Sequence, residues 1–511
     1  MTFNEDDPFG DNFGGKGNGA DQDNRQLKKN ALGLVHCIAM SMSGVGPTTG
    51  IFFVFIQLAA VAGTSVPFTM IIGTLCCLSM ASTISVFAKH ISTSASFYSY
   101  VSEGLGKEIG FITGWLMLVG YLILSLQTVI QFSSTTADVI TRNTGWDFPW
   151  IIAAAIVIVL ISTLAYIGIN PALKLSLVMV VCETLVVLVF SLIVLIKGGA
   201  EGNYPMAFTP AGPYSNGFSG LCRGLVFATL AFLGFETAGT LGRESRNPNK
   251  AIPRAVVGSV LLTGAWMVFG MYAMVVATGA SEIFHLGNIS FPIDSFGRRY
   301  VSNWFAVFLD IAGISSTFNV CTCSFNNLYR ILFSIGKADI NRPLSLLSYT
   351  SKKFSTPHAA IIFFTGYMVT LIGVVAAIFG IYTKGSWKIY GYLSFIGTLP
   401  LIMVFIITNI AVIPFVRKNH PKEFNVFFHF ILPIFSAILF TGILFGNFYP
   451  DPPQSPNSYM LIGLGALIGL GIIFMLVLRK KEGALEKMVY LVGSDGNDNY
   501  SATSINQDPF H

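Results

Sequence analysis

Among the acidic residues that lie inside otherwise apolar stretches, two stand out first for their chemistry. Glu236 lies within the apolar stretch 221–242, and Glu183 lies in the middle of the stretch 175–196. A carboxyl group in apolar surroundings is costly and is usually retained for a function. Glu236 could accept a proton, act as a gate or pair with an amine. The structural alternative, for both acids, is a hydrogen bond to a neighbouring helix.

A cluster of small residues and one proline interrupts the first apolar stretch, 31–60. It reads Ser43-Gly44-Val45-Gly46-Pro47-Thr48-Thr49-Gly50 and is called the first break below. Glycine weakens a helix, and proline removes a backbone donor and crowds the preceding turn. Two of the glycines also match the start of a dinucleotide-binding fingerprint, but the third glycine is misplaced and no strand surrounds them. We therefore expect a helix that is interrupted here.

A second break, Leu233-Gly234-Phe235-Glu236-Thr237-Ala238-Gly239, interrupts the sixth apolar stretch. Backbone groups freed inside a membrane are tolerated only where they face water or a ligand. Free N–H groups at a helix start suit a carboxylate, and carbonyl ends suit an ammonium group or Na⁺. The alternative is that the glycines only allow close helix packing. The predicted binding residues are Ser43, Gly44, Gly46, Thr48, Thr49, Gly50, Phe232, Gly234, Phe235 and Thr237.

Three polar residues of the eighth apolar stretch form a further candidate site. Ser315 and Asn319 are four residues apart and share a helix face, with Ser316 close beside it. Their hydroxyl and amide oxygens could coordinate Na⁺ together with carbonyls of the first break. The alternative is ordinary hydrogen bonding between helices. Together with Glu236 and Glu183, these residues are the candidates for binding a coupling ion.

The elements that carry these residues are membrane spans. The chain of 511 residues is 53% hydrophobic and only 11% charged, whereas soluble domains carry about 25% charged residues. A span needs about 20 apolar residues. Twelve stretches qualify, and no β-barrel pattern appears: 31–60, 66–88, 110–138, 149–167, 175–196, 221–242, 254–279, 302–333, 357–381, 388–415, 426–448 and 458–478.

The distribution of charge predicts how these spans are oriented. With twelve spans both termini share one side, and most of the 30 Lys and Arg residues fall on that side. The positive-inside rule then makes both termini cytoplasmic in a multi-pass protein of the cell membrane. Residues 1–29 are expected to form a disordered cytoplasmic tail, residues 30–480 the membrane domain and residues 481–511 a polar cytoplasmic tail.

The positions of the two breaks indicate an inverted repeat. If spans one to five and six to ten are two halves, the interrupted spans occupy matching places. An odd number of spans in each half turns the halves upside down relative to each other, as in inverted-repeat transporters. The predicted fold is therefore an all-α polytopic membrane protein with a five-plus-five core, broken helices 1 and 6, and two further helices.

Several classes of protein are disfavoured by missing motifs. The sequence contains no His-Glu-x-x-His, no Gly-x-Ser-x-Gly and no Ser/His/Asp constellation, which argues against an intramembrane enzyme. It also lacks the phosphate-binding loop of nucleotide-driven pumps. The 7 cysteines show neither disulfide nor zinc spacing. We expect no catalytic residues, no cofactor, no metal centre and no nucleic-acid partner.

Several motifs resemble those of amino acid–polyamine–organocation permeases. The second break and the run Glu244-Ser245-Arg246-Asn247-Pro248-Asn249-Lys250-Ala251-Ile252-Pro253-Arg254-Ala255 resemble the family's sixth span and following loop. The resemblance extends over roughly residues 30–480. Further matches are Gly44 through Phe52, Gly110-Phe111-x-x-Gly114-Trp115, Asn319, Arg330 and Thr356-Pro357.

The resemblance implies secondary active transport of amino acids, with the bilayer, a small-molecule substrate and H⁺ or Na⁺ as partners. Proton-coupled symport is the favoured form. The alternatives are Na⁺-coupled or exchange transport of a related amine, such as a polyamine or ethanolamine, or a non-transporting sensor on the same fold. Many proton-coupled members place a lysine in the fifth span, where this chain has Glu183 and no mid-span lysine.

Overall fold

The structure is a computed structural model. It describes residues 33–480 except 92–95, 242–244, 289–292, 338–344, 352–353, 355 and 450–454. The expected disordered tail 1–29 and the expected cytoplasmic tail 481–511 therefore lie outside the described part of the chain. Within that part no β-strand forms, and an isolated bridge joins Gly63 to Ser215.

Twelve helical segments of the described chain are long and apolar enough to cross a membrane, which confirms the predicted number. The first span, Leu34–Ala62, consists of α2 (Leu34–Val45), α3 (Pro47–Thr49), η1 (Gly50–Val54) and α4 (Phe55–Ala62). The sixth consists of α10 (Gly217–Phe232) followed by η3 (Phe235–Leu241). The others are α5 (Val66–His90), α7 (Lys107–Thr144), α8 (Trp150–Ile167), α9 (Ile169–Lys197), α11 (Pro248–Thr278), α13 (Asn303–Lys337), α15 (His358–Phe379), α16 (Thr383–Asn419), α17 (Leu432–Gly446) and α18 (Asn457–Arg479).

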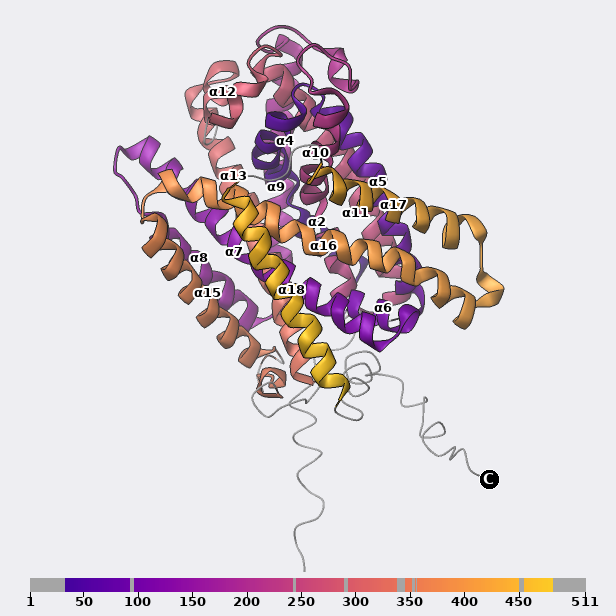
Figure 1. The fold of residues 1–511 in the computed structure, drawn as a ribbon. Coiled ribbons are helices and arrows are strands. Elements are labelled where there is room, and N and C mark those ends of the chain that lie inside the picture. The colour runs from indigo at the N-terminus through magenta and orange to yellow at the C-terminus, as the bar shows by residue number, and fades with distance from the viewer. Residues whose placement is uncertain are drawn as a thin grey trace, which may run out of the picture.

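The interrupted spans lie at the centre of the bundle. In the first span 78% of the most apolar window is buried, compared with 17% in α18. Figure 1 shows α2 and α10 near the middle, α8 beside α15 on one flank, and α18 across the front. The backbone of both breaks is therefore shielded by surrounding helices, as polar backbone inside a membrane must be.

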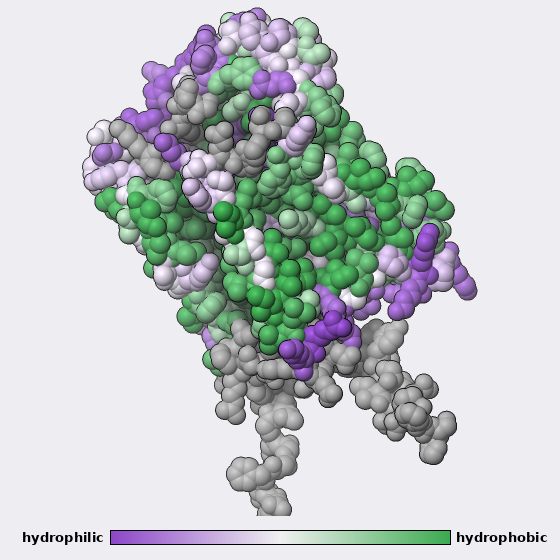
Figure 2. Space-filling model, in the orientation of Figure 1, coloured by the Kyte–Doolittle hydropathy of each residue, from purple (hydrophilic) through white to green (hydrophobic). Residues whose placement is uncertain are grey.

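The outer surface of the molecule is apolar, as expected for a protein surrounded by lipid. Figure 2 shows a broad apolar band between hydrophilic ends of the molecule. Large exposed hydrophobic residues such as Ile196, Ile378 and Ile462 lie on α9, α15 and α18. In water such a continuous apolar surface would drive aggregation, whereas hydrocarbon tails cover it without cost.

Two short helices and two extended ones depart from the sequence prediction. Helices α6 (Phe97–Leu105) and α12 (Ile293–Tyr300) are too short to appear as apolar stretches. Helices α7 and α16 continue past their predicted ends, because helical hydrogen bonding does not require apolar side chains. The polar end of α7 is stabilised by Arg142, which pairs with Asp138 one turn earlier.

Candidate binding site between the two broken helices

The first break is a true interruption of the helix. Helix α2 ends at Val45, and Gly46 adopts the left-handed conformation with φ 59°. The chain restarts with Pro47 as the first residue of α3 (Pro47–Thr49) and then forms the π-helical turn η1 (Gly50–Val54). A side chain at Gly46 would be strained and would also meet Val320 at 2.2 Å. The Gly-Pro pair thus ends one half-helix and begins the next.

The second break is centred on Gly234. Helix α10 ends at Phe232, Leu233 adopts an extended ψ of 130°, and Gly234 has φ 113°. The 3₁₀ turn η3 then follows. Thr237 closes this turn, because its backbone N–H and its hydroxyl both donate to the Gly234 carbonyl, at 3.0 and 2.6 Å.

The two breaks touch each other through their backbones. A Cβ atom on Gly44 would lie 2.8 Å from the Gly234 oxygen, and a Cβ on Gly234 would lie 2.3 Å from the Gly44 carbonyl carbon. Nearby, the Ser41 hydroxyl donates to the Phe235 carbonyl at 2.7 Å. Glycine is needed at both contact positions because the backbones approach within the space that a side chain would fill.

Glu236 links the second break to α7. Its side chain is buried, with 2% of its surface exposed. The Tyr121 hydroxyl donates to Oε1, and the Gly234 backbone N–H donates to Oε2 at 3.0 Å. The carboxyl group therefore satisfies a backbone donor that the break would otherwise leave unpaired. The bond from Tyr121 on α7 is the kind of hydrogen bond to a neighbouring helix that would explain a buried acid by a structural role alone.

A cavity of about 60 Å³ lies where the two breaks meet. Gly44, Thr49, Gly50, Gly234 and Thr237 are the predicted binding residues that line it. The remaining predicted residues, Ser43, Gly46, Thr48, Phe232 and Phe235, are buried beside it and are not part of its wall.

Much of the cavity wall comes from residues that the sequence analysis did not single out. Helix α7 contributes Tyr121, Gln127, Thr128 and Gln131, and α16 contributes Tyr390. The spacing from 124 to 127, 128 and 131 places one face of α7 toward the cavity. The sequence did offer one signal for this part of the wall, because Gln127 and Gln131 are polar residues one helical turn apart within an apolar stretch.

The lining is uncharged and combines apolar with polar side chains. None of the residues that the structure shows around the cavity is acidic, basic or a histidine. The side-chain nitrogen of Gln131 is buried and has no hydrogen-bond partner among the described residues. An unpaired buried donor is costly, and a bound ligand or water would satisfy it.

The predicted ion-coupling residues fall into two groups. Glu183 on α9 faces Ser315, Ser316 and Asn319 on α13, so the structure brings these four together. Glu236 lies at the second break instead. The Ser316 hydroxyl oxygen accepts hydrogen bonds from the Thr49 N–H and hydroxyl, both at 2.9 Å. The group around Glu183 is therefore connected to the first break and, through Thr49, to the cavity.

The Glu183 group contains polar atoms without partners. Glu183 is buried, with 2% of its surface exposed. Neither of its carboxylate oxygens has a hydrogen-bond partner within the described chain, and neither do the two side-chain amide atoms of Asn319. The groups that face this carboxyl are neutral hydroxyls and an amide, so a charge there is costly in an apolar interior, and a proton or a cation would neutralise it.

Comparison with known proteins identifies the family. The family model for amino acid permeases matches residues 36–487, so the chain belongs to that family. The branched-chain amino acid permease BcaP of Bacillus subtilis is 24% identical over 400 residues, covering 75% of this chain and 80% of the relative.

Two further relatives from Escherichia coli K12 differ in what their names say they carry. A D-serine/D-alanine/glycine transporter is 24% identical and covers 46% of this chain and 51% of its own length. The low-affinity putrescine importer PlaP is 21% identical and covers 89% of this chain and 94% of its own. Membership of this family makes the chain a multi-pass membrane transport protein.

Proposed function

We propose that this amino acid permease carries a small amino acid with an uncharged side chain, bound in the cavity where the two breaks meet. The observation that carries the proposal is the uncharged cavity, lined by polar as well as apolar residues, at the contact between Gly44 and Gly234. Transport follows when the two halves of the fold rock around this site and expose it to each side in turn.

The ends of the broken helices supply the charges that an amino acid needs. The half-helix that restarts at Pro47 directs its positive dipole end toward the break and suits the substrate carboxylate. Helix α10 ends at Phe232, and Leu230 and Ala231 of its last turn line the cavity. The Leu230 carbonyl accepts the Leu233 N–H, and the remaining carbonyl groups of such a turn suit the substrate ammonium group.

The size and polarity of the cavity argue for a small neutral side chain. A volume of about 60 Å³ holds roughly five water-sized groups, since one water needs about 10–15 Å³ by this measure. Glycine and alanine are of that size. A polyamine carries several positive charges and would need acidic partners, which the lining residues of the described chain do not include.

Proton coupling is part of the proposal, and we assign the coupling site to Glu183. Glu236 already accepts hydrogen bonds from Tyr121 and Gly234, and releasing them would disturb the second break. Glu183 has no such bonds and lies beside Ser316, which contacts the first break through Thr49. Na⁺ bound among the same oxygens is the competing form.

We further propose that the protein lies in the cell membrane and that both of its termini are cytoplasmic.

Uptake by proteoliposomes tests this function directly. Purified protein is reconstituted and offered labelled glycine, alanine, leucine or putrescine, with a pH gradient or a Na⁺ gradient imposed separately. We expect glycine and alanine to accumulate when the pH gradient alone is present. Accumulation of putrescine without any amino acid would contradict the proposed substrate, and a strict requirement for Na⁺ would contradict the proposed ion.

A further inference from the structure

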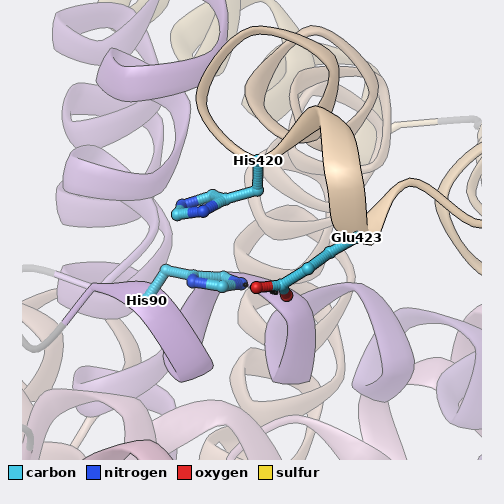
Figure 3. Close-up of side chains that lie close together, drawn as sticks. All are labelled: His90, His420 and Glu423. Atoms are coloured by element: carbon cyan, nitrogen blue, oxygen red, sulfur yellow. Dashed lines mark ion pairs between the residues drawn. The ribbon is translucent and has the colours of Figure 1, made fainter.

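A cluster of three potential metal ligands lies away from the cavity, where α5 ends near the connection between α16 and α17. His90 is the last residue of α5, His420 directly follows α16, and Glu423 ends the short 3₁₀ turn η6 (Pro421–Glu423). Figure 3 shows the two imidazole rings stacked face to face and the Glu423 carboxylate directed at His90. The ring centroids are 3.8 Å apart, and His90 Nε2 lies 3.5 Å from Glu423 Oε2.

We propose that His90, His420 and Glu423 form a binding site for a divalent transition-metal ion of the zinc type. One ligand atom from each residue lies within 4.8 Å of the others. Zinc binds imidazole nitrogen and carboxylate oxygen at about 2.0–2.2 Å, so tetrahedral ligands lie about 3.3–3.6 Å apart. Side-chain rotations that shift the ligand atoms by roughly 1 Å and turn the stacked rings, so that one nitrogen of each points at a common ion, would complete the site and leave a fourth position for water.

The surroundings hold the ligands in place and leave the site accessible. Phe415 packs against both imidazoles, with its ring 6.1 Å from His90 and 5.6 Å from His420. The side chain of Glu423 is 63% exposed, so an ion can arrive from solvent. Rings that are already ordered lose little conformational entropy when they bind a metal.

A neighbouring histidine provides a matched control. His429 lies close by in the π-helical turn η7 (Phe427–Ile431), at the start of the eleventh span, but its Nδ1 accepts a hydrogen bond from the Asn425 backbone N–H at 2.9 Å. In the neutral ring the proton then lies on Nε2, so neither nitrogen offers a free lone pair. Lys89 also carries a charge close to His90, and this lysine is present in every variant that is compared.

The site would join the two halves of the fold. His90 ends the second span, while His420 and Glu423 follow the tenth. A bound ion would restrict relative motion of these elements and thereby slow transport. This consequence rests on the proposed function, whereas the binding itself does not.

Zinc titration of the purified full-length protein tests the proposal without reference to transport. Titration calorimetry is carried out in a background where Cys182 and Cys222, the cysteines that are not fully buried, are replaced by serine. We expect one equivalent to bind to the parent protein. H90Q, H420Q and E423Q should each weaken binding by more than about tenfold, the scale on which even outer partners of metal ligands act.

The control variant H429Q should bind zinc like the parent protein. Each variant's melting temperature without metal establishes that it is folded, and a zinc-induced rise should occur only in the parent and H429Q. Unchanged binding in both H90Q and H420Q, or an equal loss in H429Q, would overturn the site. If zinc binds as expected but proteoliposomes show no uptake of any substrate, the failure lies with the proposed function and not with the site.

Discussion

The backbone of Gly44 lies directly against that of Gly234, at the point where the two broken helices cross. A methyl group on Gly234 would come within 2.3 Å of the Gly44 carbonyl carbon, and one on Gly44 within 2.8 Å of the Gly234 oxygen. Residues 190 positions apart in sequence thus share a contact that only glycine allows, beside the cavity that we assign to the substrate.

Replacing Gly234 by alanine should damage both folding and transport. The new methyl group would overlap the Gly44 backbone, and φ 113° is unfavourable for any residue with a side chain. Overpacking and backbone strain each cost about 1–3 kcal/mol, so the melting temperature should fall clearly. Gly258→Ala on α11 is the control, because nothing lies within 4 Å of its Cβ. A Gly234→Ala protein as stable and active as Gly258→Ala would contradict the close crossing.

Glutamine substitutions should separate the roles of the two buried acids. Glu183→Gln cannot carry a proton, so it should abolish accumulation driven by a pH gradient alone. Exchange of labelled for unlabelled substrate at equal pH should survive, because it needs no net proton movement. Glu236→Gln should retain pH-driven accumulation but melt at a lower temperature, since the hydrogen bonds from Tyr121 and Gly234 are disturbed. The opposite pattern in the uptake assay would move the coupling role to Glu236.

Gln131→Leu should weaken substrate binding. Gln131 lines the cavity and its side-chain nitrogen is buried without a partner among the described residues, so we expect it to donate to the bound substrate. Loss of one such bond costs about 0.5–1.5 kcal/mol, which would raise KM by up to about tenfold. Thr136→Val on the same helix is the control, because its hydroxyl donates to the Phe132 carbonyl outside the cavity. An equal KM in the two variants would remove Gln131 from the site.

Cysteine labelling should establish the orientation. Pro213 precedes the sixth span and Lys250 lies in the first turn of α11, beyond the other end of that span, and both residues are exposed. With both termini inside, a cysteine at position 213 should react with a membrane-impermeant maleimide in intact cells. A cysteine at position 250 should react only after permeabilisation. Labelling of position 250 from outside would invert the proposed topology.

The number of spans and the positions of both breaks could be predicted from the sequence because each depends on local composition. Twenty apolar residues must cross a bilayer whatever they pack against. Glycine and proline weaken a helix wherever they occur. The predicted interruption at 43–50 contains Gly46, where α2 ends, and the second contains Gly234.

Which residues surround the cavity was decided only by tertiary packing. Gln127 and Gln131 lie on the face of α7 that meets the breaks, because of how the long helices pack. Helical periodicity shows which residues share a face, but not which other element that face contacts. Glu236 was recognisable as unusual, but its partner Tyr121 lies 115 residues earlier. Glu183 and Ser316 were separate candidates in the sequence. They became one group because α9 packs against α13, a long-range contact that no local pattern encodes.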